Sequence, residues 1–352
     1  MSTHTESNVL RKPRVLEMER FPIPSIGPED MLLQVEMVGV CGGDVIEFEG
    51  RNYKAHYPMI LGHEIAGWVL EVGDLARADY AVTPGDRVSV EPYILCRKCR
   101  YCLTGLYQFC TSSKVYGVNI SSDTPPHLWG AYGQLMYVAP GSRVHRVVPS
   151  VDPRAACMAS VLGNGVRWIN TLGKAAIGER ILVLGSGAQG MASIVAAQEA
   201  GAGEIVCLAQ RQRTASAKLA GSLGASVLYS DEIDLPAIEN HFDLAIECTG
   251  VDTMLDVAIK SLKPAGRLVQ VGTRGGTAAN VNMDQIVFKE ITFLGGLGQS
   301  WNTEAAVAII NSEKYPIHQF ISHVFSVSEA AKALRLAQDN DPEVVHLALR
   351  PD

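Results

Sequence analysis

The sequence predicts an α/β protein of two domains, one rich in β-strands and one built as a doubly wound parallel sheet. Three observations lead to this prediction. The chain has 352 residues, more than one core of ordinary size holds. Apolar residues make up 47% of it and charged residues 19%, as in packed globular proteins. The apolar pattern also changes near Asp152, from short runs broken by Gly and Pro to alternating strands and helices.

The first half of the chain has the spacing of strands and turns. Its main apolar runs are Met31 to Val38, Ile65 to Val72, Arg87 to Val90 and Gln134 to Val138. We therefore expect a β-rich domain over residues 1–150.

The second half alternates strands with Ala-rich helices, which favours βαβ units and a parallel sheet. The predicted strands are Ile181 to Leu184, Ile205 to Ala209, Leu244 to Glu247, Leu268 to Val271 and Ile291 to Leu294, and the predicted helices lie near Met191 to Ala200, Thr214 to Leu223 and Asp252 to Leu262. Gly295, Gly296 and Gly298 mark the exit from this sheet. We expect the parallel-sheet domain over residues 151–297, and residues 298–352 to return to the first domain.

The composition excludes several classes of function. A net charge of -7, without a Lys/Arg block, disfavours nucleic acid and anionic membranes as partners. Residues 1–14 carry no apolar run of signal-peptide length, and no later run reaches the roughly 20 residues of a membrane span. We expect a cytoplasmic protein with a small-molecule substrate.

A glycine-rich turn between the first predicted strand and helix of the second half indicates a dinucleotide site. Gly185 permits the tight turn, Gly187 lets the backbone approach a pyrophosphate, and Gly190 lets the helix pack on the strand. The turn and its continuation read Gly185-Ser186-Gly187-Ala188-Gln189-Gly190. Gly272, which follows a later strand, is included in this cofactor site. An ordinary strand-to-helix turn is the alternative interpretation.

The end of the second strand indicates which dinucleotide binds. An acidic residue there would bind the ribose 2′-hydroxyl of NAD(H), but none is present. Arg211 and Arg213 stand there instead, and guanidinium groups suit a 2′-phosphate. We predict a preference for NADP(H) over NAD(H), with a solvated loop as the alternative.

Four of the eight cysteines lie in one short segment, as C-x2-C-x2-C-x7-C. Four thiolates at this spacing can close a tetrahedron around a structural zinc ion. A disulfide pair and an iron–sulfur cluster are the competing interpretations. The four residues are Cys96, Cys99, Cys102 and Cys110, within a lobe that we place at residues 91–112.

Two further motifs lie within the β-rich half: Cys41-Gly42-Gly43-Asp44 and Gly62-His63-Glu64. Alone, each has a structural explanation, as a buried Cys or a hydrogen-bonded His. Taken in order with Gly85-Asp86-Arg87-Val88, the cysteine lobe and the glycine-rich turn, they resemble the zinc-containing medium-chain alcohol and polyol dehydrogenases. The resemblance runs from about Val15 to Pro351.

The resemblance implies a GroES-like catalytic domain around a Rossmann domain, and usually a dimer or tetramer. By this analogy Cys41 and His63 ligate a catalytic zinc, Glu64 is the best candidate for a third ligand, and Asp44 orients His63. Zinc would act as a Lewis acid on an alcohol or carbonyl.

The sequence departs from the family pattern in two places. Ser160 or Val161 aligns where many members have a further Cys or Glu ligand, and Cys157 is out of register. Gly43 and Ile46 occupy the positions of the usual hydroxyl and histidine of the proton relay, so water, Glu64 or another group must replace them.

The leading hypothesis is an NADP(H)-dependent dehydrogenase or reductase of an alcohol/carbonyl pair. Five aromatic residues lie in segments that face the substrate cleft in the resembling family, which hints at a bulky, partly apolar secondary alcohol or ketone. The five, about half of which we expect to be packing residues, are Tyr53, Tyr93, Tyr116, Trp129 and Tyr132. The alternatives are an NADPH-dependent reductase of C=C or C=N bonds and a non-catalytic NADPH-binding protein. A zinc-finger reader of nucleic acid is disfavoured by the acidic charge.

Overall fold

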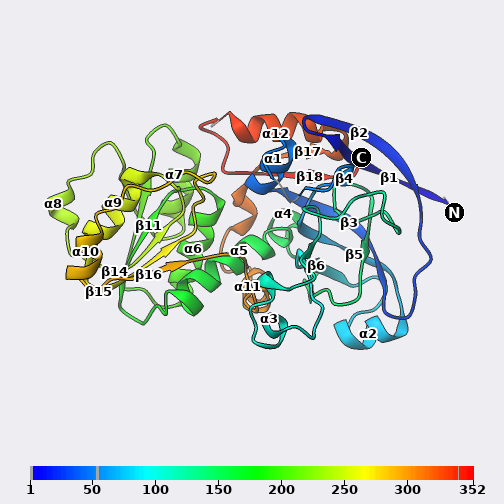
Figure 1. The fold of residues 1–352 in the computed structure, drawn as a ribbon, viewed down its shortest axis with the longest axis horizontal. Coiled ribbons are helices and arrows are strands. Elements are labelled where there is room, and N and C mark those ends of the chain that lie inside the picture. The colour runs from blue at the N-terminus through cyan, green and yellow to red at the C-terminus, as the bar shows by residue number, and fades with distance from the viewer. Residues whose placement is uncertain (1–2, 53–54, 340) are drawn as a thin grey trace. The chain divides into compact units, whose positions relative to one another are not determined.

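The computed structural model describes residues 3–52, 55–339 and 341–352 (Figure 1). The chain divides into two compact units, Met1–Ser160 with Ala306–Asp352, and Val161–Ala305. The sequence-based domain boundaries after residues 150 and 297 stay a prediction. No helix in the described part of the chain is long and apolar enough to cross a membrane.

The first unit is rich in short strands. Its elements are β1 (His4–Lys12), β2 (Val15–Pro22), β3 (Met31–Val40), α1 (Gly42–Phe48), β4 (Met59–Ile60), β5 (Glu64–Val72), α2 (Asp74–Tyr80), β6 (Arg87–Val90), β7 (Tyr93–Ile94), α3 (Arg100–Leu103), η1 (Tyr107–Phe109), β8 (Lys114–Val115), β9 (Leu135–Val138), β10 (Val144–Arg146), α4 (Pro153–Ala156), η3 (Ile317–Phe320), β17 (Ile321–Ser326), η4 (Val327–Glu329), α12 (Ala330–Gln338) and β18 (His346–Arg350). Helices α5 (Ala159–Val166) and α11 (Thr303–Asn311) cross the two boundaries between the units.

The main sheet of this unit pairs the last strand of the chain with an early one. Its strands run in the order β10-β6-β5-β3-β18-β17, with β9 also paired to β3. The C-terminal strand β18 is antiparallel to β3, with Leu347 opposite Val40 (red and blue in Figure 1). This pairing returns the last part of the chain to the sheet that carries the first motifs.

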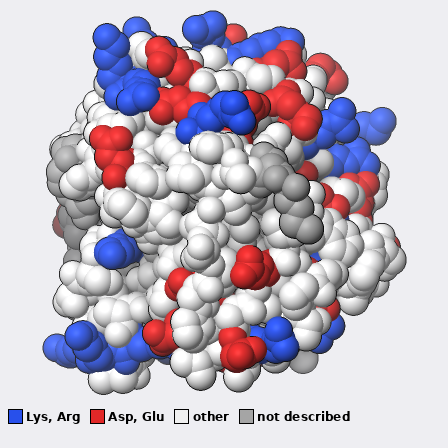
Figure 2. Space-filling view, turned by 90° about the vertical axis from the view of Figure 1, so that its right-hand side faces the viewer, with Lys and Arg blue, Asp and Glu red and all other residues white. Residues whose placement is uncertain are grey.

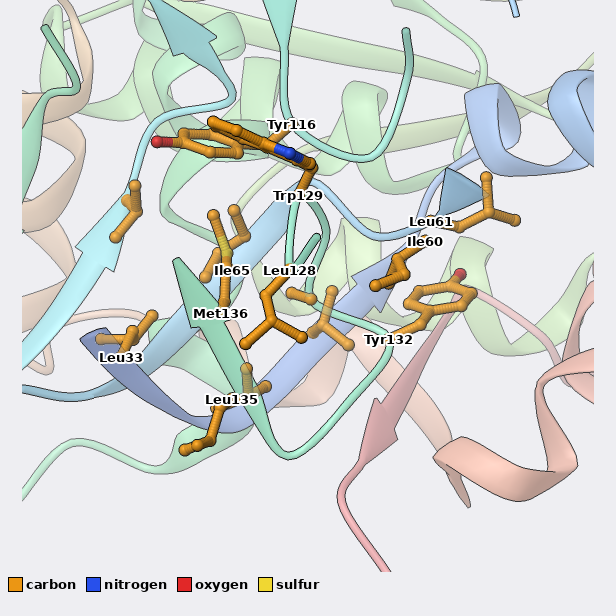
Figure 3. Packing of buried hydrophobic residues seen from close by; sticks show 14 of the residues in the cluster. Leu33, Ile60, Leu61, Ile65, Tyr116, Leu128, Trp129, Tyr132, Leu135 and Met136 are labelled. Carbon is orange, nitrogen blue, oxygen red and sulfur yellow. The ribbon is translucent and has the colours of Figure 1, made fainter. Parts of the chain in front are cut away.

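The apolar core of this unit includes side chains of the main sheet. Figure 3 shows Leu33, Ile65 and Met136 pointing into it from β3, β5 and β9. Successive residues of a strand point to opposite faces of the sheet. The burial of these strands therefore alternates only where one face of the sheet meets solvent. In the view of Figure 2, Lys and Arg are interspersed with Asp and Glu, and no large field of one sign covers the surface.

The second unit is a six-stranded parallel sheet with helices. Its elements are η2 (Arg167–Leu172), β11 (Arg180–Leu184), α6 (Ala188–Glu199), β12 (Glu204–Ala209), α7 (Thr214–Ser222), β13 (Ser226–Tyr229), α8 (Leu235–Ile238), β14 (Phe242–Glu247), α9 (Asp252–Ser261), β15 (Leu262–Gln270), α10 (Met283–Phe288) and β16 (Thr292–Gly295). The strand order is β13-β12-β11-β14-β15-β16. This is the doubly wound order of dinucleotide-binding sheets, whose order reverses between β11 and β14.

Helices cover both faces of this sheet, as alternation along β11 shows. Leu182 and Leu184 belong to the cluster that contains Leu255 of α9. Val183 points to the opposite face, toward α6. A Cβ on Gly190 of α6 would lie 3.5 Å from the Val183 side chain. Both faces of β11 are therefore buried, which is why its sequence is a continuous apolar run.

The strands that the sequence analysis missed have weak apolar patterns. Strand β1 buries the polar residues Ser7 and Asn8, and Asn8 Nδ2 donates to the carbonyl oxygen of Val327 at 2.8 Å. Strand β13 lies at the edge of the parallel sheet and is only half-buried. Neither segment has the apolar run or the clean alternation that predicts a strand.

Candidate active site

Cys41, His63 and Glu64 meet at the end of two neighbouring strands. Glu64 begins β5 and lies opposite Gly39 of β3 in the antiparallel ladder, while Cys41 follows β3 as the N-cap of α1. This register places Cys41 beside His63. One sulfur, nitrogen or oxygen ligand atom from each of the three residues lies within 4.8 Å of the others.

Asp44 lies beside His63. Its fully buried carboxylate accepts a hydrogen bond from the Cys41 backbone N–H at 2.9 Å, and its other oxygen lies 3.3 Å from His63 Nδ1. Tyr132 Oη also donates to Asp44, at 3.3 Å. A carboxylate on one ring nitrogen leaves the other nitrogen for a metal ion, as in many zinc sites. The role predicted for Asp44 stays a prediction, and this geometry supports it.

Glu64 has a partner that the sequence analysis missed. His346 Nε2, on β18, lies 2.7 Å from Glu64 Oε2. The close approach of Glu64 depends on Gly39, because a Cβ there would lie 1.9 Å from Glu64 Oε2. No local motif marks His346, since 282 positions separate it from Glu64 and only the pairing of β18 with β3 brings them together.

The donor chemistry of this group fits a divalent cation. Burial raises the pKa of the Cys41 thiol, and the nearby Glu64 carboxylate raises it further. Burial raises the pKa of Glu64, but His346, His63 and Cys41 together lower it, and the net pKa lies below its ordinary value. A thiolate, an imidazole and a carboxylate are zinc ligands, and three protein ligands with an open position are typical of catalytic zinc. A cation would replace the thiol proton.

The four cysteines of the lobe also fit a metal ion. Their sulfur atoms lie within 4.8 Å of one another, and all eight cysteines of the chain are free thiols. Cys96 Sγ and Cys102 Sγ are 3.9 Å apart. A tetrahedron with Zn–S bonds of about 2.3 Å has edges of about 3.8 Å. The sulfur positions therefore match one tetrahedral ion and do not support the disulfide interpretation.

Two sets of contacts hold the lobe in place. Backbone N–H groups donate to its sulfurs, from Cys96 to Cys110 Sγ at 3.4 Å and from Cys99 to Cys96 Sγ at 3.4 Å. Buried Tyr107 donates its hydroxyl to Glu91 Oε2 at 2.5 Å, just beyond β6. Glu91 also lies 2.8 Å from His145 Nε2 on β10. This carboxylate joins the lobe to the main sheet.

The glycine-rich turn has the geometry of a pyrophosphate site. Gly185 has φ of +111°, a region that favours glycine, and a Cβ on Gly190 would lie 1.9 Å from the carbonyl oxygen of Gly185. A Cβ on Gly187, the N-cap of α6, would meet no atom within 4 Å. Packing therefore requires Gly190, whereas the space at Gly187 is open to a ligand. Ala188 and Gln189 begin α6, whose N-terminus attracts anions.

A second loop lies at the same edge of the sheet and was missed by the sequence analysis. Buried Glu247, the last residue of β14, accepts hydrogen bonds from the backbone N–H groups of Thr249 at 2.7 Å and Gly250 at 2.9 Å. Its backbone carbonyl accepts one from the predicted cofactor residue Gly272, at 2.9 Å. The carboxyl ends of β14 and β15 are thus tied together where doubly wound sheets bind cofactors.

Arg211 and Arg213 follow β12, at the predicted adenosine end of the site. Arg211 Nε lies 3.1 Å from Asp231 Oδ2, and its guanidinium also pairs with Glu232 and stacks over Tyr229. Arg213 is the N-cap residue of α7. A phosphate at this loop must therefore compete with two carboxylates for Arg211.

Several other predicted positions have a packing role or lie apart from the metal group. Tyr116 and Trp129 stack in the core of the first unit, and Tyr132 is fully buried there (Figure 3). Tyr93 packs against the cysteine lobe, and Tyr53 lies outside the described residues. Tyr93, Tyr116 and Trp129 therefore have the packing role expected of about half of the five, and the bulky substrate stays a prediction. Cys157 and Ser160 are buried but are absent from both metal-ligating groups found in the described residues.

The two units are those of a class of oxidoreductase, and comparison with known proteins identifies the family. The family model for the alcohol dehydrogenase GroES-like domain matches residues 27–150, and that for zinc-binding dehydrogenases matches residues 188–312. A probable alcohol dehydrogenase of Mycobacterium tuberculosis is 34% identical over 327 residues, covering 88% of this chain and 87% of that protein. The chain belongs to the zinc-containing medium-chain dehydrogenase family.

Solved structures agree with this assignment. An alcohol dehydrogenase of Thermotoga maritima is 26% identical and has a TM-score of 0.89, with all of both chains covered. A zinc-binding dehydrogenase candidate of Sinorhizobium meliloti, solved with NADP bound, is 23% identical with a TM-score of 0.89, covering 99% of this chain and 100% of that one. The predicted GroES-like domain and Rossmann sheet are confirmed.

Proposed function

We propose that this protein transfers a hydride between NADP(H) and an alcohol/carbonyl pair, at a zinc ion held by Cys41, His63 and Glu64. One observation carries the proposal: a thiol, an imidazole and a carboxylate converge within 4.8 Å, and an Asp44 oxygen lies 3.3 Å from Nδ1 of the imidazole. A non-catalytic binding protein has no evident need for this group of residues. A small-molecule substrate and a homo-oligomer belong to the same proposal.

Some residues of the site would bind the zinc ion or the cofactor, and others would position those residues. A bound zinc ion supplies a Lewis acid that polarises the substrate oxygen. Cys41 and His63 would hold the ion, Asp44 would orient His63, and His346 would hold the Glu64 carboxylate in place. The open backbone at Gly187 and the N-terminus of α6 bind the pyrophosphate of the cofactor.

Substrate assays test the reaction class. We expect the purified protein with NADPH to reduce ketones or aldehydes, and with NADP+ to oxidise the corresponding alcohols. The panel pairs small with bulky secondary alcohols, because a preference for bulky, partly apolar substrates is part of the proposal. Enones and imines are included, since Gly43 stands where a relay hydroxyl is usual and favours the second candidate, a reductase of C=C or C=N bonds. Activity on enones or imines alone would reject the alcohol/carbonyl assignment.

Cofactor preference is tested at the two arginines after β12. We expect Arg211→Ala/Arg213→Ala to weaken NADPH binding about tenfold or more, because a hydrogen bond to a charged group contributes about 1.5–3 kcal/mol. NADH has no 2′-phosphate, so its affinity should stay within about twofold. Fluorescence titration measures both dissociation constants. Arg180→Ala, at the amino end of β11, is the matched control. An unchanged ratio of the two affinities would remove the predicted preference.

A further inference from the structure

A buried carboxyl group lies one helical turn beyond Asp44. Glu47, on α1, is 3% exposed. Its Oε1 accepts a hydrogen bond from Asn52 Nδ2, and its Oε2 is buried with no hydrogen-bond partner in the described part of the chain. Burying a carboxylate oxygen without a partner costs free energy, so each such group in a native structure calls for an explanation. Nothing in the mechanism above uses Glu47.

The helix face that carries Glu47 begins at the metal ligands. Gly43 and Glu47 are four positions apart on α1, and residues at this spacing are neighbours on one face of a helix. A Cβ on Gly43 would lie 3.5 Å from the Cε1 atom of His63 and 3.8 Å from Cys41 Sγ. Gly43 therefore leaves the space beside the metal ligands free of side chain, and Glu47 is the next residue along that face.

The surroundings of Glu47 set its protonation near neutral pH. Burial raises the pKa of Glu47 to about 7, against the hydrogen bond from Asn52, which lowers it. Asp44 raises this pKa further and His63 lowers it. Tyr57 contributes a hydroxyl that donates to the Glu47 backbone carbonyl oxygen at 2.7 Å.

Helix α12, which packs against α1, presents no charge to this site. Its buried residues are Ala330, Ala333 and Leu334, while Lys332 and Arg335 are exposed. Among the described residues around Glu47, the titratable groups are therefore Asp44, Tyr57 and His63.

We propose that Glu47 is the proton acceptor of this enzyme, in place of the relay hydroxyl and histidine whose positions Gly43 and Ile46 occupy. This inference rests on the proposed function. In alcohol oxidation the C–H bond breaks and its hydride passes to the oxidised nicotinamide dinucleotide. The O–H proton passes to the Glu47 carboxylate, directly or through one water molecule, and the C–O bond becomes a C=O bond. Carbonyl reduction runs through the same groups in reverse.

The direction of the pH dependence follows from this role. Oxidation requires the ionised form of Glu47, so its rate should rise with pH through about 7, the pKa of that carboxyl. Reduction requires the protonated form, so its rate should fall across the same range. Removing the Asn52 donor should move both inflections to higher pH, because that hydrogen bond lowers the pKa of Glu47.

Glu47→Gln tests the proposal directly. We expect kcat for alcohol oxidation to fall about 100-fold, within the usual range for general acid–base catalysis, and the inflection near pH 7 to disappear. The matched control is Glu49→Gln, which removes an exposed carboxylate paired with Arg14 and should leave rate and profile unchanged. Zinc content and NADPH affinity should be unaltered in both variants.

Two further measurements keep the test independent of a single activity assay. Difference infrared spectroscopy should detect a carboxyl group that titrates near pH 7 in the wild type and is missing from Glu47→Gln. Gly43→Ser in the Glu47→Gln background should recover at least about tenfold of the lost rate, since the space beside His63 accepts a hydroxyl that can pass the proton.

The results separate this inference from the proposed function. A wild-type protein inactive on all alcohols would overturn the proposed function. An active wild type, with Glu47→Gln retaining both its rate and its inflection, would overturn only the role of Glu47. The same conclusion would follow if infrared spectroscopy found no carboxyl group titrating near pH 7.

Discussion

Replacing Cys41 with Ser is expected to lower kcat/KM for the alcohol/carbonyl reaction by about a thousandfold or more. The thiolate is the metal ligand, and a serine hydroxyl stays neutral and binds zinc poorly. Loss of a Lewis acid removes several kcal/mol of transition-state stabilisation, and each 1.36 kcal/mol is about tenfold in rate. Steady-state kinetics at saturating cofactor measure the effect, and NADPH affinity should stay near its wild-type value.

Cys157→Ser is the matched control for this variant. Cys157 is buried in the same unit, but its sulfur lies outside the metal-ligating group of Cys41, His63 and Glu64. We expect this substitution to leave kcat/KM within about threefold of the wild type, as for conservative changes away from a site. A loss as large as that of Cys41→Ser would instead make Cys157 a ligand, and would contradict the choice of Glu64.

Replacing Cys102 with Ser is expected to remove the metal of the lobe and to lower the Tm of the protein by about 10 °C or more. Metal binding to small zinc modules contributes about 10–16 kcal/mol, and a third of that would shift the Tm of a unit of this size by this amount. The lobe has little other support, since its buried cluster consists of Leu95, Tyr107 and the cysteines. Calorimetry of the purified variant measures the change.

Cys207→Ser separates this effect from the general cost of changing a buried cysteine. Cys207 lies in β12 with no exposed surface and takes no part in either metal-ligating group. Its substitution should cost about 1–2 kcal/mol, a few degrees at most. Equal shifts for the two variants would show that the lobe contains no stabilising metal.

The sequence was most informative where chemistry depends on residues close together in the chain. The four cysteines of the lobe span 15 residues and come together as their spacing predicts. The glycine-rich turn is equally local, because a strand, a turn and a helix follow one another directly. In both places the covalent spacing limits the geometry to very few arrangements.

Contacts between distant segments could not be found in this way. His346 reaches Glu64 only because β18 pairs with β3, and no local pattern specifies that pairing. The role of the aromatic residues was likewise open from the sequence, which assigned about half of them to packing. Tyr116 and Trp129 lie in the core, where large rings bury much apolar area. Burial of an aromatic ring depends on the whole fold, which a motif does not specify.

The zinc content of the wild-type protein and of Cys41→Ser tests the central claim most directly. Elemental analysis of protein expressed with added zinc should find two zinc ions per chain in the wild type, one for each metal-ligating group of the described residues. Cys41→Ser should retain one ion, in the cysteine lobe. One zinc ion per chain in both proteins would contradict a catalytic metal at Cys41, His63 and Glu64.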